Sequence, residues 1–146
     1  MEEYLKRIAE ALERAFPLDP DNFFFEKADA FIWEPAQNHF SQVNEISTID
    51  ISLLKGMDEE IEQVRLNTEA FIEEKLANNI LVWGARGMGK STLIKSVVKA
   101  ASSGSNRLKI IEVSRDDIGQ VNQLFKLIKS IDKKFIIFCD DISFDD

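Results

Sequence analysis

The sequence has little cysteine, histidine or proline, and it has no long apolar run. Of its 146 residues, one is cysteine, one is histidine and three are proline. A single cysteine, Cys139, cannot close an intrachain disulfide, which favours a reducing compartment. The N-terminus is acidic and amphipathic and lacks the apolar stretch of a signal peptide, and no segment approaches transmembrane length. We therefore expect a cytoplasmic protein without a membrane partner.

The chain has enough apolar residues to form a core, and its charge is unevenly distributed. Hydrophobic residues make up 45% of the chain. Residues 1–79 carry 7 basic and 18 acidic side chains, a net charge of −11, whereas residues 80–146 carry 11 and 8, a net charge of +3. The acidic first half argues against nucleic-acid binding, because phosphates would be repelled, and it favours protein partners. The mildly basic second half suits a small anionic ligand.

The first third of the chain predicts one helix and an aromatic-rich segment. Apolar spacing predicts a helix over residues 3–16, which the prolines of residues 17–22 end. Residues 23–35 hold four phenylalanines and Trp33, which either pack onto the rest of the protein or form a patch for a partner. Residues 36–55 show no sustained period, and residues 45–52 read as a short strand or an extended strap. His39 lies in this irregular part and is given no role.

The remaining chain alternates between strand and helix patterns. Asp58 is a suitable N-cap for a helix that continues to about Leu76. A continuously apolar run, Ile80–Trp83, predicts a strand buried on both faces. Further helices are expected at 90–101 and 118–131, and further strands at 109–113 and 135–139. From residue 80 the order is β-α-β-α-β, which is typical of a parallel sheet with right-handed crossovers.

The turn between the first of these strands and its helix matches G-x-x-x-x-G-K-[S/T] at every fixed position, over residues 84–91. A triphosphate must be wrapped closely by backbone N–H groups, so glycines stand where the chain curls with positive φ. The helix that follows directs its N-terminal N–H groups at the phosphates. Lys90 would contact the β- and γ-phosphates, and Ser91 would offer its hydroxyl to Mg²⁺. The alternative is a plain strand–turn–helix with a glycine hinge.

The predicted nucleotide-binding residues are Gly84, Ala85, Arg86, Gly87, Met88, Gly89, Lys90, Ser91 and Thr92. Arg86 and Met88 occupy variable positions, so their backbone N–H groups rather than their side chains would line the turn.

Two acids follow the last predicted strand. Asp140 is the first acid beyond it, where a nucleotide-bound Mg²⁺ finds a carboxylate in sites of this kind, so Ser91 and Asp140 are the predicted metal ligands. Asp141 stands where a general base would orient water, although Asp is one methylene shorter than the Glu usual there. With Lys90 it forms the predicted catalytic pair. The alternative for both acids is a solvated loop, and Cys139 is expected to be a small buried apolar group.

Three stretches, "NNILVWGARGMGKSTLIKSVV", "LKIIEVSRDDI" and "KFIIFCDDISF", together with "LLKGMDEEIEQVRLNTEAFI" upstream, resemble a bacterial family of predicted AAA+ ATPases of unassigned function, domain of unknown function 815. The resemblance runs from about Leu53 to Asp146. It implies an ATP-binding AAA+ core that forms oligomers, with residues 84–91 as the phosphate loop and Ser91 with Asp140 as the Mg²⁺ site. It places Asp141 at the hydrolytic position and Gly56–Asp58 near the adenine.

The family's complete module would continue beyond this sequence with two core strands, a sensor, an arginine finger and a helical lid. In AAA+ sheets a strand lies between the acidic strand and the phosphate-loop strand. We therefore expect either that residues 80–83 and 135–139 pair directly, or that an open sheet edge is left.

Together these patterns predict an α/β fold: an incomplete P-loop NTPase sheet of AAA+ type with flanking helices, preceded by a mainly helical N-terminal region. The expected division is an N-terminal region over 1–52 and a partial nucleotide-binding domain over 53–146. The expected function is ATP and Mg²⁺ binding by a protein of ATPase ancestry. The alternatives are a binding or interaction module without hydrolysis, and a fragment that folds poorly alone.

Overall fold

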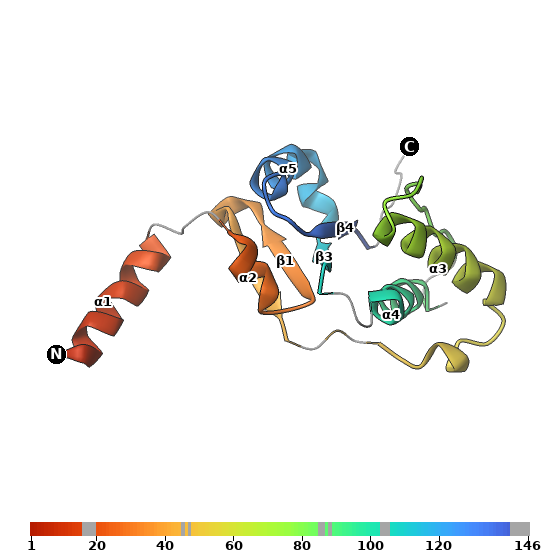
Figure 1. Cartoon of the computed structure of the whole chain (residues 1–146), viewed down its shortest axis with the longest axis horizontal. Coiled ribbons are helices and arrows are strands. Elements are labelled where there is room, and N and C mark those ends of the chain that lie inside the picture. The colour runs from red at the N-terminus through yellow and green to blue at the C-terminus, as the bar shows by residue number, and fades with distance from the viewer. Residues whose placement is uncertain are drawn as a thin grey trace.

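A four-stranded mixed sheet lies at the centre of the fold (Figure 1). The computed structural model describes residues 1–15, 20–44, 46, 48–84, 87, 89–102 and 106–140. The strands are β1 (Ala30–Glu34), β2 (His39–Val43), β3 (Leu108–Glu112) and β4 (Lys134–Phe138), in the order β2-β1-β3-β4. β1 and β2 are antiparallel, whereas β1 with β3 and β3 with β4 are parallel. An α/β fold with a mostly parallel sheet is thus confirmed.

Five α-helices accompany the sheet in the described residues: α1 (Glu2–Ala15), α2 (Asn22–Glu26), α3 (Asp58–Ile72), α4 (Lys90–Ser102) and α5 (Val121–Ile128). Three short 3-10 helices, η1 (Pro35–Gln37), η2 (Ile51–Leu53) and η3 (Arg115–Gln120), complete the regular structure. The bounds of α4, β3 and β4 differ from the predicted ones by one residue. α5 is shorter than the helix expected over 118–131, and η3 forms the first part of that range.

The aromatic segment forms the core of one face of the sheet. Phe25, Phe31 and Trp33 are fully or almost fully buried, and the ring of Phe25 lies 4.9 Å from the rings of both Phe31 and Phe135. Leu124 of α5 is buried in the same cluster. Edge-to-face aromatic contacts of this kind add to the stabilisation from burial alone. The first alternative for residues 23–35, packing onto the rest of the protein, is therefore confirmed for these aromatic side chains except Phe23, which is 67% exposed.

The opposite face of the sheet is covered by α4 and the end of α3. Val98 of α4 packs with Leu108, Ile110 and Phe138 of the strands. A third apolar cluster joins the two helices and contains Leu54, Val64, Leu93 and Val97. Helices therefore cover both faces of the sheet, as the apolar character of its inner strands requires.

The expected N-terminal region contains two strands where helical or irregular structure was predicted. β1 and β2 form a hairpin around η1, and Asn38 makes its turn with a φ of 49°. His39 thus lies in β2, opposite Glu34. β2 is too short, with one buried aromatic side chain, to show a period in the sequence. The pairing of β1 with β3 brings the hairpin into the same sheet as residues beyond 53.

The predicted strand Ile80–Trp83 is wrong: these residues have no strand structure. Leu81 is 64% exposed and Trp83 is 87% exposed. An apolar run becomes a strand only if its N–H and C=O groups find a neighbour, and within the described residues β4 is the last strand on this side. Of the two expected arrangements, the open edge is the one observed.

α3 and α1 show smaller differences. The N-cap of α3 is Met57, without a side-chain hydrogen bond, so Asp58 is its first residue rather than its cap. Its acidic first turn matches the helix dipole instead, and the helix ends at Ile72, before the exposed Leu76. α1 forms as predicted. None of the described helices is long and apolar enough to span a bilayer.

Candidate functional site

The three glycines of the turn have the positive φ angles that the sequence predicts. Gly84, Gly87 and Gly89 have φ angles of 144°, 76° and 77°. A Cβ at Gly89 would meet only Leu54 Cδ2, at an ordinary 3.9 Å, so the backbone angle and not lack of space calls for glycine there. Ala85, Arg86 and Met88 lie outside the described residues.

The helix α4 begins at Lys90, directly after the last glycine of the turn. Leu93 N donates to Gly89 O at 2.8 Å, which ties the last glycine into the first helical turn. Lys90 is the first residue of α4, and its Nζ donates to Gly84 O at 2.9 Å. The Lys90 side chain therefore connects the end of the turn with its beginning. A cation beside a helix N-terminus is an arrangement that suits an anion.

The two predicted metal ligands meet. Ser91 Oγ donates to Asp140 Oδ2 at 2.5 Å, although the two residues are 49 positions apart. Asp140 lies two residues beyond the end of β4 and Ser91 is the second residue of α4, so the contact joins the turn to the sheet. A hydroxyl and a carboxylate oxygen are ligands that Mg²⁺ prefers, so the residues present fit this ion. Asp141, the predicted base, lies outside the described residues.

Thr92 and Cys139, which are next to Ser91 and Asp140 in the sequence, are both half-buried. Thr92 continues the first turn of α4, as expected. Cys139 is less buried than the apolar group that the sequence predicts. Burial, and then the negative charges of Asp140 and Glu112, raise the pKa of its thiol. A raised thiol pKa lowers the thiolate fraction and makes the sulfur a poor nucleophile.

An ion pair beside the site was missed by the sequence analysis. Lys95 Nζ lies 2.8 Å from Glu112 Oε2, and it also stands 5.1 Å from the centre of the Phe138 ring. Glu112 ends β3 and pairs in register with Phe138. Two signals could have found it: an acid at the end of a predicted strand, and a lysine one helical turn after Ser91.

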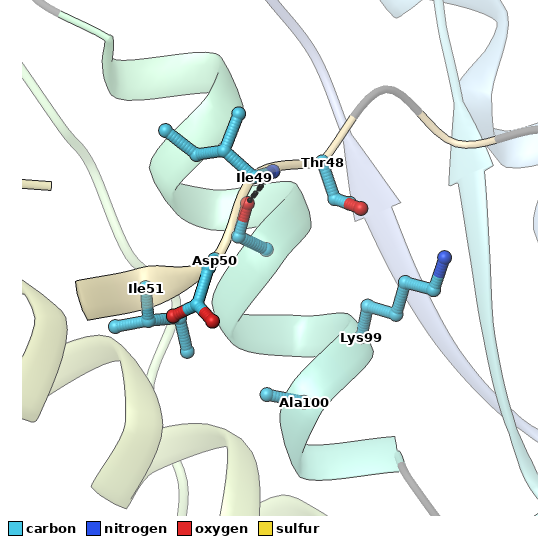
Figure 2. Close-up of a pocket in the computed structure, with 7 residues that line it drawn as sticks. Thr48, Ile49, Asp50, Ile51, Lys99 and Ala100 are labelled. Carbon is cyan, nitrogen blue, oxygen red and sulfur yellow. Dashed lines mark hydrogen bonds between the residues drawn. The ribbon is translucent and has the colours of Figure 1, made fainter. Parts of the chain in front are cut away.

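Two pockets lie away from these residues. One of about 300 Å³ is lined by Thr48, Ile49, Asp50, Ile51, Ser96, Lys99 and Ala100, where the segment before η2 crosses α4 (Figure 2). Ile49 N donates to Ser96 Oγ at 3.1 Å, which fits the extended strap predicted for this part of the chain. A second pocket of about 280 Å³ shares Lys99. Neither pocket is lined by a predicted site residue.

A family model described as "Protein of unknown function (DUF815)" matches residues 26–146. The chain belongs to the DUF815 family. The match covers the whole candidate site and extends to β1 and β2, beyond the region in which the sequence motifs carry the resemblance. Of the helices, α1 lies wholly outside the DUF815 match. Comparison with curated proteins and with solved structures finds no match.

Proposed function

We propose that this DUF815 chain binds ATP together with Mg²⁺, with the phosphates in the turn of residues 84–92. The observation that carries the proposal is the contact between Ser91 Oγ and Asp140 Oδ2. The sequence marks the two residues by different features, Ser91 by the glycine motif and Asp140 by its place after an apolar strand that follows the motif. A chance glycine hinge does not require that its first serine meet that particular acid.

The backbone N–H groups of the turn and of the first turn of α4 would bind the phosphate oxygens. Lys90 would exchange its contact with Gly84 O for the β- and γ-phosphates, because an ammonium group binds a charged phosphate oxygen more strongly than a neutral carbonyl oxygen. Ser91 and Asp140 would hold the Mg²⁺. The ion, when bound, would neutralise charge on the phosphates.

Binding and hydrolysis are separate proposals. Hydrolysis needs groups that stabilise the transferring phosphoryl group and a base that orients water. Asp141 follows Asp140 directly and would be that base. The exposed segment Ile80–Trp83, which has no strand structure, leads into the turn without the support of a sheet. This favours a chain that holds nucleotide without turning it over.

Isothermal titration calorimetry with ATP in the presence and absence of Mg²⁺ tests the proposal. We expect saturable binding that is tighter with Mg²⁺. Lys90→Ala should weaken it about ten- to a hundredfold, because a hydrogen bond to a charged group is lost. Ser91→Ala should remove the advantage given by Mg²⁺. Lys126→Ala, on the exposed surface of α5, is the matched control and should bind as the unaltered chain does.

The absence of heat at sub-millimolar ATP from folded protein would reject the proposal. Phosphate release under the same conditions measures hydrolysis. Release that Lys90→Ala and Asp141→Asn both abolish would establish turnover, and release at the background rate would leave binding alone.

A further inference from the structure

We propose that Lys95 is a positioning residue for the candidate metal site. Through its ion pair with Glu112, it holds α4 in the orientation in which Ser91 contacts Asp140. The inference rests on the proposed function for its nucleotide measurements. It concerns an ion pair that no sequence motif marks.

The helix geometry makes Lys95 the natural partner of Ser91. Residues four apart on a helix lie on the same face, so Lys95 stands one turn along from Ser91 and points to the same side. From this side Ser91 contacts Asp140, beyond β4, and Lys95 contacts Glu112, at the end of β3. Two polar contacts one turn apart therefore attach a single face of α4 to the carboxyl ends of two neighbouring strands.

Two attachment points restrict motion that one would allow. Buried apolar side chains already hold α4 against the sheet and α3. Within that packing, the Ser91 contact alone would leave the first turn of α4 a small rotation that carries the hydroxyl away from the carboxylate. The second contact prevents this rotation, and the position of Lys95 Nζ over the Phe138 ring adds a third element, β4, to the same attachment. The Lys95 side chain is 22% exposed, so water screens the pair less than it screens an open surface pair.

The pair also distinguishes the two carboxylates at the carboxyl end of β3 and beyond β4. Glu112 pairs in register with Phe138, which is two residues before Asp140. Both acids therefore lie at the carboxyl end of the sheet. The Lys95 ammonium group engages Glu112, whereas the Ser91 hydroxyl donates to Asp140, so each of the two acids has its own partner on α4. Residues that orient the ligands of a metal in this way commonly change metal affinity when they are replaced.

Charge alone would have a different signature from positioning. Lys95→Met removes a positive charge, whereas Glu112→Gln removes a negative one. If the pair acted only through its field on the metal, the two variants would shift the Mg²⁺ dependence of binding in opposite directions. If the pair positions Ser91, both variants shift it in the same direction.

The quantity to measure is the ratio of the ATP dissociation constant without Mg²⁺ to that with Mg²⁺, by calorimetry. We expect Lys95→Met and Glu112→Gln each to lower this ratio, by about tenfold, and Lys95→Arg to restore it, because arginine keeps the charge and the hydrogen bond. Lys133→Met is the matched control. It breaks a partly buried ion pair with Glu26 at the opposite end of β4, and it should leave the ratio unchanged.

A second measurement needs no nucleotide. Thermal unfolding of Ser91→Ala, Lys95→Met and the double variant forms a cycle. If Lys95 positions Ser91, the double variant loses less in its thermal midpoint than the sum of the two single losses, because the Ser91 contact is already weakened without Lys95. Additive losses, or Mg²⁺ ratios that stay unchanged or move in opposite directions, would overturn the inference. Failure of the unaltered chain to bind ATP would instead reject the proposed function, and the cycle would still decide the role of Lys95.

Discussion

Lys109 is a charged side chain buried in β3. Its Nζ donates to Ala28 O at 2.8 Å, to Asp29 Oδ1 at 3.1 Å and to Asn106 Oδ1 at 2.8 Å, and its side chain is fully buried. Three acceptors match the three donors of an ammonium group. The lysine thus ties the segment before β1 to the start of β3, the pairing that joins the hairpin to the rest of the sheet.

Lys109→Met should lower the free energy of unfolding by about 2–4 kcal/mol, because the acceptors around a buried charge lose their donor. Urea unfolding measures this value. Lys55→Met, at an exposed lysine in the turn before α3, is the control and should change the free energy by less than about 0.5 kcal/mol. Equal losses in the two variants would mean that the Lys109 contacts contribute nothing specific.

Asp50 caps η2 with its carboxylate, which accepts a hydrogen bond from Ser52 N at 2.9 Å. Hydrogen bonds from Ser52, from its side chain and then from its backbone, hold the pKa of Asp50 below its usual value of 3.8. A lowered pKa in the folded state means that the ionised carboxylate stabilises the fold. Its contribution is complete above pH 3.8 and is lost as the pH falls through the lower, folded-state value.

Asp50→Ala should therefore lower the thermal midpoint at pH 7, and this difference from the unaltered chain should shrink as the pH falls below 3.8. Thermal unfolding monitored by circular dichroism at pH 7 and at about pH 2.5 measures both differences. A difference that stays constant with pH would show that the ionised carboxylate is not the stabilising form.

At the scale of elements, α1 is a helix whose apolar side is uncovered. Tyr4, Leu5, Ile8 and Leu12 are each more than half exposed, and the helix extends away from the rest of the chain (Figure 1). The DUF815 match begins after it. Since burial of apolar area is what stabilises a domain, a helix that buries so little contributes little to the stability of the sheet.

Deletion of residues 1–19 should therefore leave the free energy of unfolding unchanged to within about 0.5 kcal/mol, as for an exposed surface change. Urea unfolding with tryptophan fluorescence measures it, because the buried Trp33 reports on the core. A loss of several kcal/mol would show that α1 packs on the sheet in solution. Trp33→Phe in the full chain, which changes the core itself, is the positive control.

Elements that carry their own local signal could be predicted from the sequence, and those that depend on a distant neighbour could not. The glycine turn, α4 and the two strands β3 and β4 are each marked by their own residues, and so are Ser91 and Asp140. The hairpin β1–β2 depends on pairing with β3, about 80 residues further along. The strand predicted at residues 80–83 is wrong because a strand also needs a partner. Their apolar pattern is that of a strand, but no described strand pairs with them.

The same distinction separates the two halves of the site. Lys90 and Ser91 follow from a motif, since spacing along one turn determines their place. The pairing of Lys95 with Glu112 depends on how α4 lies over the ends of the strands, which is a result of packing between distant segments. Spacing along the chain does not contain that information.

At the scale of the whole molecule, the helix that carries Ser91 links two apolar clusters. Ile94 of α4 packs against both the cluster on the sheet and the cluster shared by α3 and α4. Ser91 stands three residues before Ile94, and its contact with Asp140 joins α4 to the end of β4. A ligand held by both residues would therefore stabilise the association of α4 with the sheet, and with it the whole fold.

ATP with Mg²⁺ should accordingly raise the free energy of unfolding, by about 2.7 kcal/mol at a ligand concentration one hundred times the dissociation constant. Native-state hydrogen exchange gives the location of the effect. We expect slower exchange of the amides in the first turn of α4 and at the end of β4 together, because Mg²⁺ would join both, and no change in the β1–β2 hairpin. ATP in excess chelator should protect the turn and α4 but leave β4 as before. Protection by ATP and Mg²⁺ that stops at the turn would mean that Asp140 does not share the ligand, and that the contact with Ser91 is structural.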